Sequence, residues 1–189
     1  MKMITVDTKL IALLGKPLRQ SFSPKMQNDA YAALGVDYYY FPVEVEQDEL
    51  EAVVNGIRHM NFAGFAVTKP NKVAIMQYLD EVDDVAAMMG SCNTVVVKDG
   101  KLKGYNTDGL GCVRSLTEEG GIDIKNSTFF SFGAGGTGKS VCTELAYNGA
   151  KRIYICSRSA MCEELAANIN KYYPGVCVAV RAADQKKVE

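Results

Sequence analysis

A glycine-rich stretch from Ser131 to Ser140 has the composition of a phosphate-binding loop. It follows the apolar pair Phe129-Phe130 and precedes a helical pattern. Glycines between a strand and a helix let the backbone approach a phosphate closely, and the first N–H groups of the helix then face the anion. A nucleotide is therefore the first ligand that the sequence predicts.

The stretch matches two motifs that bind nucleotides in different ways. Gly133-x-Gly135-x-x-Gly138 is a dinucleotide fingerprint, whereas Gly133-x4-Gly138-Lys139-Ser140 has the spacing of a P-loop. The first motif favours a dinucleotide-dependent enzyme and the second a nucleotide hydrolase. Other parts of the chain must distinguish them.

Two hydroxyls lie between a predicted strand and a predicted helix, in the sequence Ser21-Phe22-Ser23-Pro24. Hydroxyls and helix N–H groups can together hold a carboxylate at such a turn. Ser23 taken alone has an ordinary explanation, because a serine before a proline at the first helical position is a typical N-cap. Both interpretations are open at this point.

Three further polar residues lie near predicted strand ends. Lys72 follows a strand that Pro70 interrupts, and Asn93 and Asp108 lie at opposite ends of a predicted hairpin. Solvation explains a lysine there, and turn chemistry explains the amide and the acid. Taken together, however, hydroxyls, a lysine, an amide and an acid all fall at strand ends, where an α/β sheet places its binding cleft.

The first 108 residues alternate predicted strands with predicted helices. Asp99-Gly100, between two β-type runs, is a strong hairpin signal. The alternation predicts an α/β domain with a mostly parallel sheet and one antiparallel hairpin. Strands are expected at 10–14, 38–45, 64–68, 94–98 and 102–105, and helices at 24–34, 50–57, 73–79 and 83–89.

A second domain, residues 109–189, carries the glycine-rich stretch. After a connecting helix around Val113 and Leu116, strands are expected at 128–132, 152–156 and 176–180, and helices at 139–148 and 163–172. This is about half of a Rossmann-type domain, which normally continues for several more strands. The uncovered sheet edge and face predict low stability and self-association, for example as a homodimer.

Composition limits the classes of partner. The chain has 189 residues, 48% hydrophobic content and a net charge of −1, which gives no electrostatic reason to expect nucleic acid or an anionic membrane as partner. The N-terminus is acidic too early for a secretory signal, and no apolar run approaches the roughly 20 residues of a membrane helix, so a soluble cytoplasmic protein is expected.

The six scattered cysteines are expected to be inert thiols. The single histidine, His59, is expected to lie at the surface, and no metal site is predicted.

The polar clusters and their order resemble those of the shikimate dehydrogenase family, from about Leu10 onward. The combination of Pro70-Asn71-Lys72 with Met26-Gln27-Asn28 is most similar to the branch that accepts quinate as well as shikimate. Two positions depart from the family pattern, Gln20 and Ala66, where members commonly have His and Asn, and they bear on substrate preference. The motifs that carry the resemblance are Gly15-x-Pro17, Ser21-x-Ser23-Pro24, Val67-Thr68-x-Pro70-x-Lys72, Asn93-Thr94 and Gly104-x-Asn106-Thr107-Asp108-Gly109.

This resemblance implies an NAD(P)-dependent oxidoreductase that transfers a hydride reversibly between 3-dehydroshikimate and shikimate, in the chorismate pathway to aromatic amino acids, or that uses quinate. It implies that Ser21 and Ser23 bind the substrate carboxylate. Lys72 and Asp108 would form the catalytic pair, with Lys72 donating or accepting the proton and Asp108 holding it by a charge-assisted hydrogen bond. The side chains implied to contact the ring hydroxyls are Tyr40, Thr68, Asn93 and Asp108.

The resemblance also favours the dinucleotide motif over the P-loop. A P-loop enzyme would place the loop after its first core strand and an acidic strand end downstream, but a complete α/β domain precedes this loop and no later strand ends in Asp. Lys139 and Ser140 are then ordinary residues of a helix that begins near Thr137. The pyrophosphate is expected on Gly133, Ala134, Gly135 and Gly136.

Two other functions remain as alternatives. A nucleotide hydrolase would show magnesium-dependent ATP turnover. A non-catalytic ligand-binding module is the second alternative, because family members continue through more strands and a C-terminal segment that returns to the first domain. Nicotinamide cofactor binding with turnover would exclude both.

The end of the second strand of the second domain predicts the cofactor. NAD-selective folds place Asp or Glu there to bind both ribose hydroxyls. This chain has Ser157, Arg158 and Ser159 instead, which suit a 2′-phosphate. NADP is therefore favoured over NAD.

Overall fold

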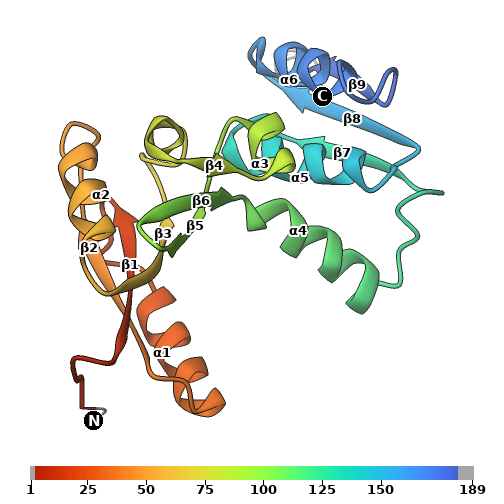
Figure 1. Ribbon diagram of the computed structural model, residues 1–189. Helices are drawn as coiled ribbons and strands as arrows, with labels where there is room; N and C mark the ends of the chain where they lie inside the picture. Colours follow the sequence, from red (N-terminus) through yellow and green to blue (C-terminus); the bar gives the residue numbers. More distant parts are fainter. Residues whose placement is uncertain (1–2, 183–189) are drawn as a thin grey trace. The chain divides into compact units, whose positions relative to one another are not determined.

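The structure, a computed structural model, describes residues 3–182 and divides into two compact units. Of the described residues, unit 1 comprises residues 3–86 with Gly90–Tyr105, and unit 2 comprises Ala87–Met89 with residues 106–182. Both units combine strands with helices, as the alternating sequence pattern predicts (Figure 1). The functional division between residues 1–108 and 109–189 stays a prediction.

Unit 1 is built on a mixed sheet in the strand order β2-β1-β3-β5-β6-β4. β1 pairs in parallel with β2 and with β3, and β4 pairs in parallel with β6. The predicted antiparallel hairpin is formed by β5 and β6, and β5 also runs antiparallel to β3, a pairing that the sequence did not predict. The two-residue strand β4 is also absent from the sequence-based prediction. The strands are β1 (Lys9–Gly15), β2 (Tyr38–Glu44), β3 (Phe62–Val67), β4 (Glu81–Val82), β5 (Thr94–Lys98) and β6 (Lys101–Tyr105).

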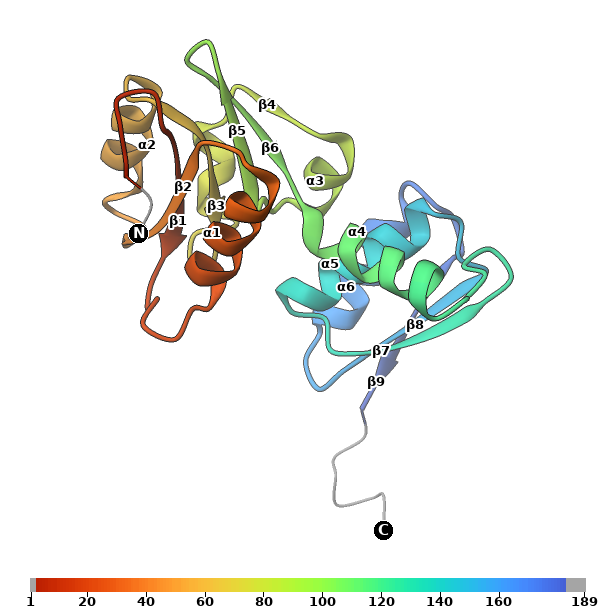
Figure 2. The ribbon, with the colours of Figure 1, turned by 90° about the horizontal axis from the view of Figure 1, so that it is seen from below.

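Helices lie on both faces of this sheet, and Figure 2 shows α1 and α2 on opposite sides of β1 to β3. Alternate residues of β1 point to opposite faces. Ala12 and Leu14 belong to the larger core beside α2, whereas Leu13 packs with Tyr40 and Tyr31 beside α1. The helices are α1 (Ser23–Leu34), α2 (Leu50–Arg58), the 3₁₀ helix η1 (Ala74–Tyr78) and α3 (Asp84–Met89), of which Ala87–Met89 belongs to unit 2.

The start of α1 differs from the predicted cap. Phe22 occupies the N-cap position, and Ser23 is the first helical residue, with no side-chain capping bond to the helix. Ser21 Oγ accepts a hydrogen bond from the Ser23 N–H at 3.3 Å instead. The N-cap interpretation of Ser23 is therefore wrong by one position, because the serine hydroxyl that meets a helix N–H comes from two residues earlier. Gly35 ends the helix in the left-handed conformation (φ 67°).

A side chain of α1 covers the edge strand β2. Asn28 Nδ2 donates to the Tyr40 carbonyl at 2.7 Å, and Asn28 Oδ1 accepts from the Tyr40 N–H at 2.9 Å. These two bonds replace those that an edge strand would otherwise leave open to another chain. Pro42, which has no N–H to donate, also fits an edge position.

The β5–β6 hairpin is tied to α2 by an arginine and an aspartate. Asp99 (φ 52°) and Gly100 (φ 73°) form the predicted turn. Arg58 Nη1 donates to the Gly100 carbonyl at 2.8 Å and to Asp80 Oδ2 at 2.6 Å. Asp80 Oδ2 also accepts from the Leu102 N–H at 2.7 Å. Hydrogen bonds from Arg58 and from the Leu102 backbone lower the pKa of the Asp80 carboxyl below its usual value.

Unit 2 contains a parallel sheet in the order β7-β8-β9. Ile153 and Ile155 of β8 are buried in one core with residues of α5 and α6. β7 lies at an edge of this sheet, where Phe130 is 50% and Phe132 88% exposed. Self-association through this edge stays a prediction. The elements are α4 (Thr107–Arg114), the π-helical turn η2 (Ser115–Glu119), β7 (Thr128–Phe132), α5 (Gly136–Tyr147), β8 (Arg152–Ser157), α6 (Met161–Asn170) and β9 (Cys177–Arg181).

Helix α4 packs against α5 at Gly109, and Figure 2 shows the two helices side by side. A Cβ atom at Gly109 would lie 2.4 Å from the Ser140 carbonyl oxygen and 2.7 Å from Glu144 Cβ, so a larger residue would force the helices apart. Asn106 caps α4 by accepting from the Asp108 N–H at 3.2 Å. The start of α4 is therefore fixed relative to α5.

The remaining sequence predictions concern single residue types. All six cysteines are free, and that they are inert stays a prediction. His59 is exposed at the end of α2, as predicted. Between residues 3 and 182, no helix is long and apolar enough to span a membrane.

The Arg58–Asp80 interaction predicts a pH dependence of stability. Because the pKa of Asp80 is lowered by folding from its ordinary value of 3.8, the ionised carboxylate stabilises unit 1 above that value and the contribution is lost as the pH falls through the folded pKa. Asp80→Asn should lower the thermal midpoint at pH 7, and acidification to about pH 3 should then cost the variant less than the wild type.

Circular dichroism melts at both pH values measure this effect. Asp48→Asn is the matched control, because Asp48 is exposed in the turn before α2. A variant at Asp80 that melts like the Asp48 control at pH 7 would contradict the assignment.

Candidate functional site

The glycine-rich loop joins β7 to α5 and leaves its backbone open. Gly133 has a φ of 117°, a conformation that favours glycine, and its N–H donates to the Cys156 carbonyl at 2.8 Å. Cβ atoms added at Gly135 or Gly136 would meet nothing within 4 Å. Helix α5 begins at Gly136, one residue before the start expected near Thr137 and three before Lys139, where the apolar pattern begins.

Gly138 sets the approach of α5 to this loop. A Cβ atom there would lie 2.2 Å from the Gly133 carbonyl oxygen and 3.0 Å from its carbon. Backbone atoms cannot yield as a flexible side chain can, so only glycine fits. The third glycine of a dinucleotide fingerprint has this packing role between helix and strand.

Two cavities of unit 2 border the glycine-rich loop. The first, about 560 Å³, extends from the loop along β7 as far as Phe129 and Leu145, and the second, about 600 Å³, lies beside the turn after β8. They share Phe132 and Gly133. The predicted cofactor residues line one or the other, apart from the buried Ala134: the first cavity is lined by Gly133, Gly135, Gly136 and Thr137, and the second by Ser157, Arg158 and Ser159. A ligand that spans both would follow the edge at which doubly wound sheets bind dinucleotides.

The geometry of Ser140 is incompatible with the P-loop alternative. Ser140 is only 1% exposed, and its hydroxyl donates to the Gly136 carbonyl of the same helix at 3.1 Å. A P-loop serine must instead reach a magnesium ion at the phosphates. In addition, β8 ends at Ser157 and β9 at Arg181, so neither supplies the acidic strand end that a hydrolase needs.

In unit 1, backbone hydrogen bonds bring three predicted site segments together. The Thr68 N–H donates to the Leu14 carbonyl, the Val67 N–H to the Asn93 carbonyl and the Cys92 N–H to the Lys72 carbonyl, each at 2.8 Å. The chain after β3, which carries Thr68 and Lys72, therefore lies between the end of β1 and the start of β5. Ser21 and Ser23 follow β1 at the same edge of the sheet, and both are partly buried.

The segment around Lys72 is held in place by Asn71, the preceding residue in the sequence. Asn71 is fully buried, and its Nδ2 donates to the Val45 carbonyl at 2.9 Å. The Asn71 N–H donates to the Thr68 carbonyl at 2.8 Å, which closes a turn before Lys72. Sequence reasoning assigned Asn71 to the quinate-accepting branch only and missed this positioning role, for which burial is the signal and sequence gives none.

Tyr40 lies apart from the strand ends that carry the other predicted substrate residues. It is in the middle of β2, 4% exposed, and paired with Ile11. Its side chain lines a separate cavity of about 360 Å³ with Tyr31 and Thr94. Burial, followed by the nearby Tyr31, raises the pKa of Tyr40 to about 12, so its hydroxyl is protonated at neutral pH. Asp108 lies in the first turn of α4 in unit 2, whereas Lys72 belongs to unit 1.

Comparison with known proteins relates both units to one family. Residues 13–95 match the model of the shikimate dehydrogenase substrate-binding domain. A shikimate dehydrogenase (NADP(+)) of Alkaliphilus oremlandii is 44% identical over 97% of this chain and 64% of its own length. The crystal structure of a shikimate dehydrogenase in complex with NADP+ is 36% identical, with a TM-score of 0.85 over 96% of this chain and 68% of that one.

The chain belongs to the shikimate dehydrogenase family. The resemblance inferred from the sequence motifs is thereby confirmed, together with the α/β fold of a substrate domain followed by part of a Rossmann-type domain. A further family structure, shikimate 5-dehydrogenase of Listeria monocytogenes in complex with shikimate and NAD, has a TM-score of 0.91 and 40% identity over 96% of this chain. The chain spans 64% of the length of that protein, as it does of the Alkaliphilus relative.

Gly138 provides a test of the loop geometry in this family member. Gly138→Ala should destabilise unit 2 by about 1–3 kcal/mol, the usual cost of overpacking, because the new methyl group would meet the Gly133 carbonyl. Thermal or denaturant unfolding measures this. Gly135→Ala is the matched control, since its Cβ would enter open space, and equal stability of the two variants would contradict the predicted contact.

Proposed function

We propose that the protein is an NADP-dependent shikimate dehydrogenase that interconverts 3-dehydroshikimate and shikimate and also accepts quinate. The observation that carries the proposal is the convergence of the family's substrate motifs at one sheet edge of unit 1. There, backbone bonds join the segments of Thr68, Lys72 and Asn93 beside the end of β1. A cytoplasmic location and a homodimer belong to the proposal on sequence grounds.

The chain's residues fit a dinucleotide. The open backbone at Gly135 and Gly136 gives a phosphate room to approach, and the start of α5 offers N–H groups without acceptors inside the helix. Arg158 supplies positive charge beside the second cavity. NADP, when bound, supplies or accepts the hydride, while the protein positions the reacting groups.

The substrate roles are distributed over unit 1. We assign the carboxylate to Ser21 and Ser23, because the turn after β1 presents both hydroxyls near a helix start. Thr68 and Asn93 contact ring hydroxyls. The Asn93 amide oxygen accepts from Thr94 Oγ1 at 2.9 Å, which orients the amide. Tyr40 stays in this set on the family resemblance alone.

Lys72 moves the proton. Hydride transfer at the ring carbon requires a proton to reach or leave the attached oxygen, and a lysine ammonium or amine can donate or accept it. Asp108 is the second member of the catalytic pair. Its backbone is fixed by the Asn106 cap and by the packing of Gly109 against α5.

Lys72→Ala tests the catalytic assignment. Because loss of a general acid–base group removes about 10²–10⁴-fold of rate, kcat should fall by that factor with a smaller change in KM. Ser23→Ala should mainly raise KM. Lys69→Ala, an exposed lysine on the same turn, is the matched control and should retain kcat.

Steady-state kinetics with shikimate and quinate, on this chain and on a form extended to the length of its relatives, measure both parameters. A Lys72→Ala enzyme with more than about a tenth of the wild-type kcat would exclude Lys72 from proton transfer. Cofactor and substrate binding without turnover in either form would favour the non-catalytic ligand-binding module.

Competitive titration of NADP and NAD tests the cofactor. NADP should bind more tightly, and Arg158→Gln should weaken NADP by about 10- to 100-fold, the scale of a lost charge-assisted hydrogen bond, with a smaller effect on NAD. Arg152→Gln is the control, because Arg152 is exposed at the opposite end of β8. Equal affinity of the wild type for both cofactors would contradict the assignment of Arg158.

A further inference from the structure

The turn after β8, Ser157 to Ser159, has all three of its carbonyl groups held by hydrogen bonds. The Ser157 carbonyl accepts from the Ala182 N–H at 3.0 Å. The Arg158 carbonyl accepts from Arg181 Nη1 at 3.3 Å, and the Ser159 carbonyl accepts from Ser157 Oγ at 2.6 Å. The peptide orientations of the turn are therefore set by its own serine and by the end of β9.

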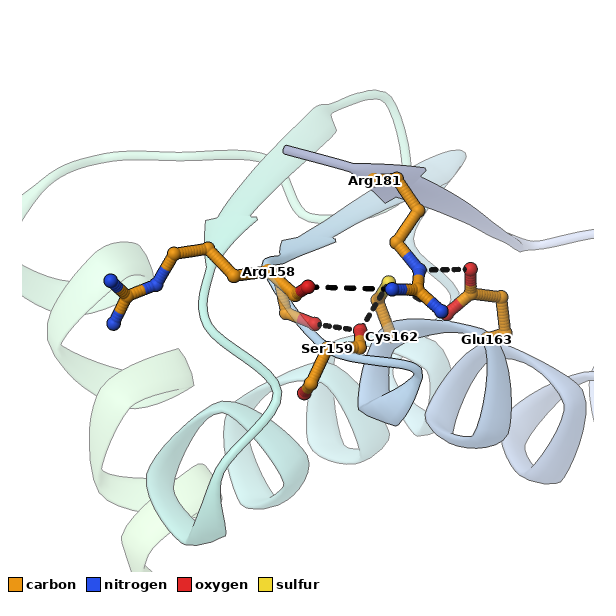
Figure 3. Close-up of polar contacts among 6 residues, drawn as sticks. Arg158, Ser159, Cys162, Glu163 and Arg181 are labelled. Atoms are coloured by element: carbon orange, nitrogen blue, oxygen red, sulfur yellow. Dashed lines mark hydrogen bonds and ion pairs between the residues drawn. The ribbon is translucent and has the colours of Figure 1, made fainter. Parts of the chain in front are cut away.

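Arg181 is the central residue of this arrangement, as Figure 3 shows. It is the last residue of β9 and is paired in register with Ser157. Its Nε donates to Glu163 Oε1 at 2.5 Å, while its Nη1 reaches the Arg158 carbonyl. One guanidinium thus joins the first turn of α6 to the turn after β8, a geometry for which the several donors of arginine are suited.

The guanidinium groups of Arg181 and Arg158 have different surroundings. Glu163 neutralises Arg181, and hydrogen bonds from Arg181 and then from Cys162 lower the pKa of Glu163 to about 2, so this pair is ionised at neutral pH. In Figure 3 the Arg158 side chain extends away from both residues. No acidic side chain among residues 3–182 pairs with Arg158, which lines the second cavity.

The Arg181–Glu163 ion pair acts by fixing the Arg158 carbonyl and adds little to the stability of the fold. The side chains of Arg181 and Glu163 are 52% and 46% exposed, and pairs at this exposure add little to folding. What the pair does hold is the direction of the Arg158 carbonyl. If that peptide rotated, its carbonyl oxygen would turn toward the cavity and repel an anion bound beside the Arg158 guanidinium.

We propose that Arg181 is a positioning residue for cofactor selection: it fixes the Arg158 peptide so that the Arg158 guanidinium faces the cavity in which a ribose 2′-phosphate binds. This rests on the proposed NADP preference. Arg181 itself does not contact the phosphate, because its charge is already paired with Glu163.

The test uses two nucleotides that occupy only the adenosine part of the site, adenosine 2′,5′-bisphosphate and 5′-AMP, titrated calorimetrically against the chain. Arg181→Met should weaken the bisphosphate by about 3- to 10-fold, the scale of one hydrogen bond, and leave 5′-AMP within about 2-fold. Arg181→Lys should recover part of the loss, since one ammonium cannot bind both partners in the same geometry. Arg152→Met is the control for removing an exposed arginine.

Glu163→Gln separates positioning from direct contact. If Arg181 is a positioning residue, this variant weakens the bisphosphate because the guanidinium loses its anchor. Tighter binding of the bisphosphate by Glu163→Gln would overturn the proposal, since a released cation would then be acting on the phosphate directly. Unchanged preference in both Arg181→Met and Glu163→Gln would also overturn it. A wild-type chain that does not distinguish the two nucleotides would instead refute the NADP preference on which the proposal rests.

Discussion

Unit 1 depends on backbone hydrogen bonds that continue beyond the ends of its strands. The bonds from Thr68 to Leu14, from Val67 to Asn93 and from Cys92 to Lys72 connect segments that are far apart in sequence. They involve no side chain, so the residues at these positions are free to carry functional groups. The parallel pairing of β1 with β3 and the reversal into β5 bring these ends to one edge, and the candidate substrate residues follow from that topology.

Unit 2 depends on a close approach between backbones. The distance from Gly138 to the Gly133 carbonyl leaves no room for a side chain, so α5 begins directly against the loop after β7. The same helix receives α4 at Gly109. The glycine-rich loop and the start of α4, which carries Asp108, therefore both pack against the first nine residues of α5, and a change in α5 would affect both.

Much of this could be predicted from the sequence because it is encoded locally. The apolar alternation located every strand except β4, which has only two residues and no pattern of its own. The Asp99-Gly100 pair located the hairpin, and the glycine spacing located the loop between β7 and α5. The motifs at Ser21, Lys72 and Asn93 indicated one edge because strand ends in such sheets converge.

The features that could not be predicted depend on contacts between distant residues. The pairing of Glu163 with Arg181 spans 18 positions, and the burial of Asn71 depends on the position of Val45. The N-cap of α1 was misplaced because a Ser-Pro pair fits two adjacent positions equally well. The position of the Tyr40 ring, which the pleat of β2 turns toward α1, likewise depends on how the sheet is assembled.

The turn after β8 has a consequence for how this protein can evolve. Its shape is maintained through main-chain carbonyls, two of them held by β9 and its flank and the third by Ser157. The side chain at position 158 takes no part in maintaining that shape. Under the proposed role of Arg158, a single codon change there alters the preferred cofactor while the fold of the turn is retained, so cofactor preference would be one of the more readily mutable traits of this chain.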